Sequence, residues 1–129
     1  MTPDKNVVGW FEIPVTDMDR AIKFYESVLD INLERHQLGH LDMAWFPNQG
    51  EANGAAGSLV CYGDFYQPSR DGVLIYFTSP TGDISNELSR VEKAGGSILK
   101  ARTQVSEEYG FMALILDTEG NRIAVHSRA

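Results

Sequence analysis

Residues 13–30 have the sequence IPVTDMDRAIKFYESVLD and join a strand pattern to a helix pattern. Residues 10–15 show a period of two, with Phe11, Ile13 and Val15 on one face, which is typical of a strand with two different faces. Asp17 suits a helix N-cap. Apolar residues recur at three- and four-residue steps over residues 18–29, and charged residues fall between them. The stretch therefore predicts a strand followed by an amphipathic helix.

The same order of patterns occurs twice along the chain. The first half continues with predicted strands at residues 31–37, 43–46 and 58–62. A polar linker with Gly and Pro, residues 63–72, lies near the midpoint. After it the sequence predicts a strand at 73–77, a helix that begins at Asp83 or Ser85 and stops at Gly95-Gly96, and strands at 97–102, 111–117 and 121–127. Each half thus predicts one strand, one helix and three strands.

This internal repeat indicates one domain, residues 1–129, made of two modules. Module 1 covers about residues 6–63 and module 2 about 72–129. One helix covers only one face of each four-stranded sheet, so the halves must pack together within one chain or be exchanged between two chains. We expect an α+β fold in which two βαβββ modules form a concave eight-stranded mixed sheet with the helices outside. Such a concave face is a natural small-molecule site.

Composition and charge exclude several function classes. The 129 residues are 43% hydrophobic and 22% charged, which is typical of one soluble domain. A net charge of −7 predicts no nucleic-acid and no membrane partner, and it favours cations if charge selects a ligand. The apolar runs are too short for a membrane span, and no secretion signal is evident at the start, so we expect a cytoplasmic protein. Cys61, the only cysteine, allows no disulfide within the chain.

The order of elements resembles the vicinal oxygen chelate superfamily, which includes glyoxalase I, extradiol dioxygenases, fosfomycin-resistance transferases and bleomycin-resistance proteins. Two motifs carry the resemblance: residues 13–30, and DTEGNRI at residues 117–123 before the last strand. Within the superfamily the chain is most similar to small glyoxalase-like and bleomycin-resistance-like proteins. The resemblance implies a homodimer, since small members commonly build their cups across two chains, and Pro14 suits an edge or seam strand.

Metal enzymes of that superfamily place His, Gln or Glu ligands on four inward strand positions. The resemblance puts two of these positions on Trp10 and Ala124. The strands expected at 57–62 and 73–77 contain no His, Glu or Gln, and Cys61 is the only conceivable donor there. Because a divalent cation needs anionic or imidazole ligands, we expect neither a metal site nor another cofactor.

Glu12 and His126 are the candidate catalytic residues. Strand alternation places Glu12 on the face of Trp10, and Arg122 and His126 on the face of Ala124, which the resemblance makes the inside of the cup. The pair could act as an acid and a base near neutral pH, or it could be a buried ion pair that only fixes the floor of the cup. The residues expected to line the cavity are Trp10, Ala124, Arg122, Trp45, Tyr62 and Tyr76.

Two hypotheses for function follow. The first is a metal-independent small-molecule binding protein, as the bleomycin-resistance proteins are. The alternative is a glyoxalase-type lyase or isomerase that acts on a small oxygenated metabolite and uses Glu12 and His126 for proton transfer. Residues 66–70 and 107–110 are either lids over the mouth of the cup or plain connections. His36 and His40, four residues apart beside a predicted hairpin, are either exposed or gate the ligand.

Overall fold

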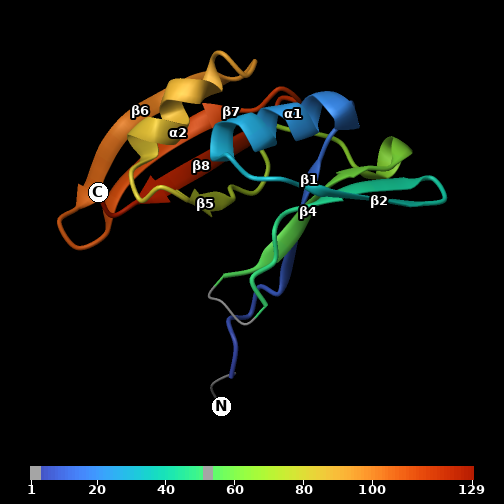
Figure 1. The fold of residues 1–129 in the computed structure, drawn as a ribbon, viewed down its shortest axis with the longest axis horizontal. Helices are drawn as coiled ribbons and strands as arrows, with labels where there is room; N and C mark the ends of the chain where they lie inside the picture. Colours follow the sequence, from blue (N-terminus) through green and yellow to red (C-terminus); the bar gives the residue numbers. More distant parts are fainter. Residues whose placement is uncertain (1–3, 51–53) are drawn as a thin grey trace.

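The computed structural model describes residues 4–50 and 54–129 and has the predicted element order (Figure 1). Module 1 contains β1 (Trp10–Pro14), α1 (Met18–Leu29), β2 (Glu34–Leu38), β3 (Leu41–Trp45) and β4 (Ala56–Cys61). A short 3-10 helix, η1 (Gly63–Phe65), begins the linker. Module 2 contains β5 (Tyr76–Thr78), α2 (Ile84–Val91), β6 (Ser97–Ser106), β7 (Gly110–Leu116) and β8 (Arg122–Ser127). The predicted α+β fold of two βαβββ modules is confirmed.

The eight strands form two four-stranded sheets, one in each module. Their orders are β1-β4-β3-β2 and β5-β8-β7-β6, and β1 with β4 and β5 with β8 are the parallel pairs. β1 and β5 are therefore edge strands, as Pro14 in β1 suggested. No strand pairing joins the two sheets in the part of the chain that the structure describes. In Figure 1 the two helices lie side by side on one side of the two sheets.

Local signals in the sequence set the helix ends. The Asp17 carboxylate accepts a 3.1 Å hydrogen bond from the Arg20 N–H and caps α1, while Asp30 ends it in the left-handed region at φ 54°. Asp83, rather than Ser85, caps α2, because its carboxylate accepts a 2.9 Å hydrogen bond from the Ser85 N–H. Neither helix among the described residues has the length and apolar character needed to cross a membrane.

The main hydrophobic core belongs to both modules. Helix α1 buries Phe24 and Tyr25 completely, and Val91, Ile115 and Ile123 of module 2 pack into the same cluster. Gly96, directly before β6, lets the chain there approach α1 closely. A Cβ at this position would lie 2.5 Å from the Phe24 ring and 2.5 Å from the Leu116 carbonyl oxygen. The modules are thus held together by apolar burial around α1.

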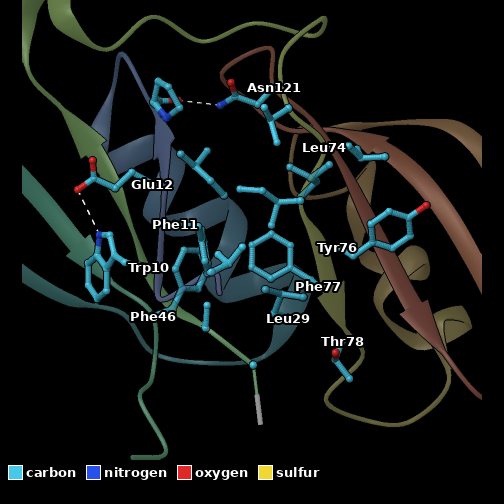
Figure 2. A pocket seen from close by; sticks show the side chains of 18 of the residues that line it. Trp10, Phe11, Glu12, Leu29, Phe46, Leu74, Tyr76, Phe77, Thr78 and Asn121 are labelled. Carbon is cyan, nitrogen blue, oxygen red and sulfur yellow. Dashed lines mark hydrogen bonds between the residues drawn. The ribbon is translucent and has the colours of Figure 1, made fainter. Parts of the chain in front are cut away.

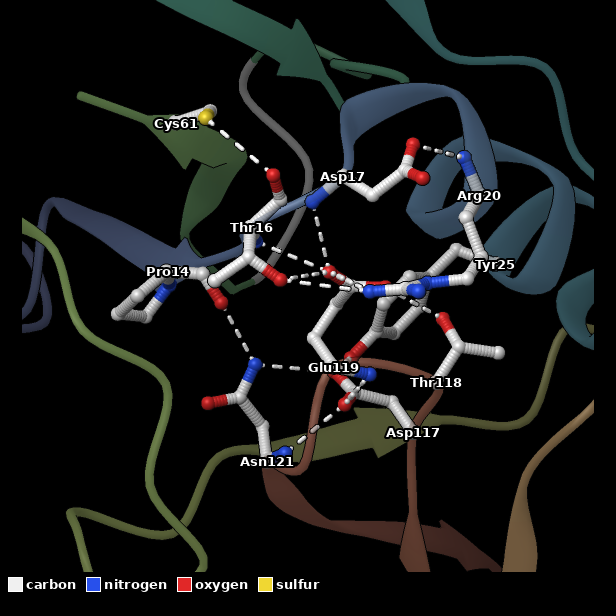
Figure 3. Close-up of polar contacts among 10 residues, drawn as sticks. All are labelled: Pro14, Thr16, Asp17, Arg20, Tyr25, Cys61, Asp117, Thr118, Glu119 and Asn121. Carbon is white, nitrogen blue, oxygen red and sulfur yellow. Dashed lines mark hydrogen bonds and ion pairs between the residues drawn. The ribbon is translucent and has the colours of Figure 1, made fainter. Parts of the chain in front are cut away.

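Polar contacts add to this connection where the β7–β8 turn meets the start of α1 (Figure 3). The buried Glu119 carboxylate accepts hydrogen bonds from the Thr16 N–H (2.9 Å), the Asp17 N–H (2.9 Å) and Arg20 Nε (2.7 Å). Burial alone would raise the pKa of Glu119. The hydrogen bonds from Arg20, Asp17, Thr16 and Thr118 outweigh burial and lower this pKa from 4.5 to about 2.

A second set of contacts lies in the same turn. The Tyr25 hydroxyl donates a 2.6 Å hydrogen bond to Asp117, and Asn121 Nδ2 donates to Asp117 and, at 2.7 Å, to the Pro14 carbonyl. Burial, followed by the Asp117 charge, raises the pKa of Tyr25 well above its usual value. The two sequence motifs that carried the family resemblance, residues 13–30 and 117–123, therefore touch each other and join the two modules.

Candidate functional site

A cavity of about 940 Å³ lies between the two modules (Figure 2). Its walls are the whole of β1 and the whole of β5, together with residues 72–75 that lead into β5. The other lining residues are mostly apolar or small and come from the end of α1, the connection between β3 and β4, the linker and the start of β8. They are Leu29, Ile31, Phe46, Pro47, Gln49, Gly54, Ala55, Gln67, Ser69, Asn121, Arg122 and Ile123, together with Val8 and Pro80.

The cavity follows the free edges of the two sheets. Both β1 and β5 pair on one side only, so consecutive residues of both strands border the gap, whichever face their side chains occupy. Phe11 and Phe77 face the helices, yet both line the cavity, and their rings meet edge to face at 5.8 Å. The site is therefore a gap between edge strands, whereas the sequence had placed it on the concave sheet faces.

Glu12 is the only carboxylate among the described lining residues. Its side chain accepts a 2.7 Å hydrogen bond from the Tyr66 hydroxyl and a 3.2 Å hydrogen bond from Trp10 Nε1, the second of which is drawn in Figure 2. The bond to Glu12, with some desolvation, raises the pKa of Tyr66. Two donors thus hold the Glu12 carboxylate in a fixed orientation at the β1 wall.

Arg122 is the only cationic residue among the described lining residues. Its Nη2 lies 3.4 Å from the Gly72 carbonyl, a long hydrogen bond. Its Nε is buried and has no hydrogen-bond partner in the part of the chain that the structure describes. The β8 side of the cavity therefore carries a guanidinium group whose donors are largely unused.

Three of the six residues expected to line the cavity do so: Trp10, Tyr76 and Arg122. Trp45, Tyr62 and Ala124 are not part of the lining. Trp45 packs between Trp10 and His36, at ring distances of 5.8 and 3.9 Å. Tyr62 stacks on Phe65 at 5.4 Å, and Ala124 is fully buried beside Tyr76 in the sheet. Trp45 and Ala124 lie on inner strands and Tyr62 directly follows the inner strand β4, so none of the three lies on β1 or β5.

The structure does not pair Glu12 with His126. The Glu12 carboxylate bonds to Trp10 and Tyr66, while His126 Nε2 contacts the Tyr109 carbonyl instead. Strand alternation had placed the two residues on inward faces, but these faces belong to separate sheets. Glu12 lines the cavity and His126 does not.

The two loops expected as lids differ in their positions. Gln67 and Ser69 of the linker line the cavity, and the linker is attached to it through Tyr66 and through a 3.1 Å hydrogen bond from the Ser69 N–H to Asn121. Residues 107–110 are not part of the lining. His36 is half-buried in β2, with Nε2 2.8 Å from a Glu34 oxygen, and His40 is exposed in the following turn. Neither histidine lines the cavity between the modules.

Besides Phe11 and Phe77, sequence reasoning missed Leu74, Ile75 and the role of Tyr66 at the site. Leu74 and Ile75 line the cavity and precede β5, which begins at Tyr76 and not at residue 73 as expected. Tyr66 was placed in a possible lid but not connected to Glu12, and a hydrogen bond across 54 residues leaves no local signal. Only the unpaired carboxylate itself, which needs a donor when buried, pointed to such a partner.

The sequence profile of the Glyoxalase/Bleomycin resistance protein/Dioxygenase superfamily matches residues 7–125. The chain belongs to this superfamily. Among solved structures, the glyoxylase/bleomycin resistance protein/dioxygenase domain from Frankia sp. EAN1pec aligns with a TM-score of 0.71 at 17% identity, over 95% of this chain and 97% of that one. A search of curated proteins found no match.

Two further solved structures show the same fold. TnmS3, an antibiotic binding protein from Streptomyces sp. CB03234, aligns with a TM-score of 0.66 at 19% identity over 99% of this chain and 100% of its own. Glyoxalase I from Zea mays aligns with a TM-score of 0.66 at 21% identity over 92% of this chain and 45% of its own. The chain thus spans about half the length of the maize enzyme.

The donor set at the metal positions of this superfamily does not fit a metal ion. The two positions that the resemblance assigns, Trp10 and Ala124, offer an indole and a methyl group, and their neighbours across the parallel pairs, Ala56 and Tyr76, add a methyl group and a phenol. No group of three or more His, Cys, Asp or Glu side chains is arranged to hold a metal within residues 4–50 and 54–129. We therefore derive no chemical step through a metal ion.

Proposed function

We propose that this superfamily member binds a small organic molecule in the cavity between its modules and needs no metal ion to do so. The observation that carries the proposal is the cavity itself, with about 940 Å³ of space and mostly apolar walls. Small-molecule sites have volumes of roughly 300 to 1,000 Å³, apolar linings and a few well-placed polar groups. Glu12 and Arg122 are such groups here.

The walls favour a ligand with a flat apolar part. Phe11, Phe46 and Phe77 lie in contact with one another at ring distances of 5.3 to 5.8 Å, and all three line the cavity. Trp10 and Tyr76 add two half-exposed rings at opposite walls, as Figure 2 shows. Aromatic surfaces of this kind stack on planar ligands. The antibiotic-binding function named for TnmS3 is consistent with such a ligand class.

The alternative, a glyoxalase-type lyase or isomerase that uses Glu12 and His126, takes second place. That chemistry requires both side chains to reach one substrate, and only Glu12 borders the cavity. The separate hydrogen bonds of Glu12 and His126 give this mechanism no support. Under the alternative, Glu12→Gln would abolish turnover.

Assembly into a homodimer also stays a prediction, which sedimentation of the purified chain would test.

The test uses N-phenyl-1-naphthylamine, a neutral aromatic probe whose fluorescence rises in apolar sites. The wild-type chain is expected to bind one probe saturably, with the same affinity in EDTA. Leu74→Trp, which fills the cavity, should abolish this binding, whereas Leu99→Trp on the exposed face of β6 should retain it. Equal binding by both variants would refute the cavity as the site, and loss of binding in EDTA would refute the metal-independent part.

A further inference from the structure

Arg122 forms no ion pair among the described residues, as Arg70 and Arg128 do not, but it alone of these three lines the cavity. Arg20, Arg35, Arg90 and Arg102 each lie within 4.0 Å of a carboxylate oxygen. None of the ion pairs among the described residues includes Arg122. Its Nε is buried without a partner, and its one hydrogen bond, from Nη2 to the Gly72 carbonyl, is 3.4 Å long. Arg122 therefore borders the cavity with one buried donor unpartnered and with no carboxylate paired to its charge.

Arg122 is half-buried as a whole, but its Nε atom is fully buried. A buried N–H donor without a partner loses its hydrogen bond to water without gaining another in return. Leu74, Ile75 and Ile123 contribute apolar surface to the same cavity. The cavity's carboxylate does not compensate it, because Glu12 is bonded to Trp10 and Tyr66 and is not within 4.0 Å of Arg122. The unpartnered group at the cavity is thus the N–H donor of Arg122, and the strongest partner for it is an anionic acceptor.

The position of Arg122 is also fixed by its neighbour. Asn121 donates to the Pro14 carbonyl of module 1 at 2.7 Å and accepts a 3.1 Å hydrogen bond from the Ser69 N–H of the linker. These bonds hold the chain at the start of β8 against both β1 and the linker. The Arg122 side chain therefore starts from a rigid point, which reduces the ordering cost of binding a ligand there.

We propose that Arg122 binds an oxyanion of the ligand, so that the cavity takes an amphipathic organic acid: an aromatic or aliphatic body that carries a carboxylate or sulfonate. This inference rests on the proposed binding function and names its ligand class. The net charge of −7 repels anions in general, so affinity for an acid must come from local pairing with a group such as Arg122. The local structure thus favours a ligand charge opposite to the one that overall composition favours.

Two probes with the same ring system test this. 8-Anilinonaphthalene-1-sulfonate carries a sulfonate on the body of N-phenyl-1-naphthylamine, which is neutral. Arg122→Met removes the charge and the donors but keeps an apolar stem. It should weaken sulfonate binding by about 10- to 100-fold, the range for hydrogen bonds to a charged group, and change binding of the neutral probe less than about threefold. Arg70→Met, an exposed arginine outside the lining with the same charge change, should leave both affinities unchanged.

The outcomes separate the two proposals. If the neutral probe binds in the cavity but Arg122→Met and Arg70→Met have equal effects on the sulfonate, the assignment of Arg122 is overturned and the proposed function stands. If neither probe shows binding that Leu74→Trp removes, the proposed function itself fails. Arg122→Lys covers the case in which Arg122→Met does not fold, since it keeps the charge and should retain more sulfonate affinity than Arg122→Gln. Equal affinities of these two variants would contradict the inference.

Discussion

Glu119→Gln tests how strongly the β7–β8 turn holds the two modules together. The Glu119 carboxylate is buried and accepts from two backbone N–H groups, two hydroxyls and the Arg20 guanidinium. A glutamine in its place keeps one acceptor oxygen and turns an –NH₂ group toward donors. The substitution should therefore lose most of the stabilisation while changing the side-chain volume very little.

The pKa of Glu119 gives the magnitude. Its fall from 4.5 to about 2 on folding corresponds to about 3 kcal/mol at neutral pH, at about 1.4 kcal/mol per pH unit. Because the folded-state pKa lies below the unfolded value, this stabilisation is complete above about pH 4.5 and is lost as pH falls toward about 2. Less than half of it should remain at pH 3. The gap between wild type and variant should therefore shrink in acid.

Urea denaturation at pH 7 and pH 3 measures both effects. At pH 7 the variant should lose about 3 kcal/mol of unfolding free energy, a shift of roughly 1 to 3 M in the urea midpoint for a chain of this size. Glu92→Gln, an exposed carboxylate after α2 without a side-chain hydrogen bond among the described contacts, is the control and should shift the midpoint little. A loss below about 0.5 kcal/mol, or an equal loss at both pH values, would refute the reasoning.

Three further substitutions test the contacts around the site. Gly57→Ala puts a Cβ 2.4 Å from the Phe11 ring and should lower the unfolding free energy by about 1 to 3 kcal/mol in urea denaturation; a neutral effect would show that the ring has room to move. Tyr25→Phe removes the hydrogen bond to Asp117 and should lower the unfolding free energy by about 1 to 3 kcal/mol. Because the pKa of Tyr25 is raised in the folded protein, the wild type should lose stability above about pH 10, and the variant should lose less. The same alkaline unfolding profile for both proteins would contradict this. Arg90→Met removes two hydrogen bonds, 2.8 and 3.1 Å long, that Arg90 donates to the Val28 carbonyl at the end of α1. It should lower the unfolding free energy from thermal denaturation by about 1 to 2 kcal/mol. No change would mean that water replaces both hydrogen bonds and would contradict the prediction.

Most of the fold could be predicted because its signals are local. The helix over residues 18–29 and its Asp17 cap follow from periodicity and one side chain, and both are confirmed. The three- and four-residue steps run through Ala21, Ile22 and Tyr25 and leave out Phe24, yet Phe24 is fully buried. A helix that covers one sheet needs one apolar stripe, but α1 also packs against module 2, so its buried face is wider than the pattern of one module indicates.

The site was harder to predict because the gap between two edge strands has no sequence period. Trp10 was expected in the cavity through the family resemblance and Tyr76 as an aromatic residue of its strand, and both line the cavity. The expected lining also included Trp45 and Ala124, which lie on inner strands, and it did not include Phe11 and Phe77. Which strand forms an edge is a property of sheet order, and sheet order depends on contacts between distant parts of the chain.

The indole N–H signals of the two tryptophans offer the most direct test of binding between the modules. Trp10 lines the cavity and donates to Glu12, whereas Trp45 lies outside the lining. In a ¹H–¹⁵N NMR titration with N-phenyl-1-naphthylamine, assigned with Trp45→Phe, the Trp10 signal should move with backbone signals of β1 and β5, and the signals of β6 should stay. An unchanged Trp10 signal, with shifts confined to β6 or the outer faces of the helices, would contradict a ligand site between the modules.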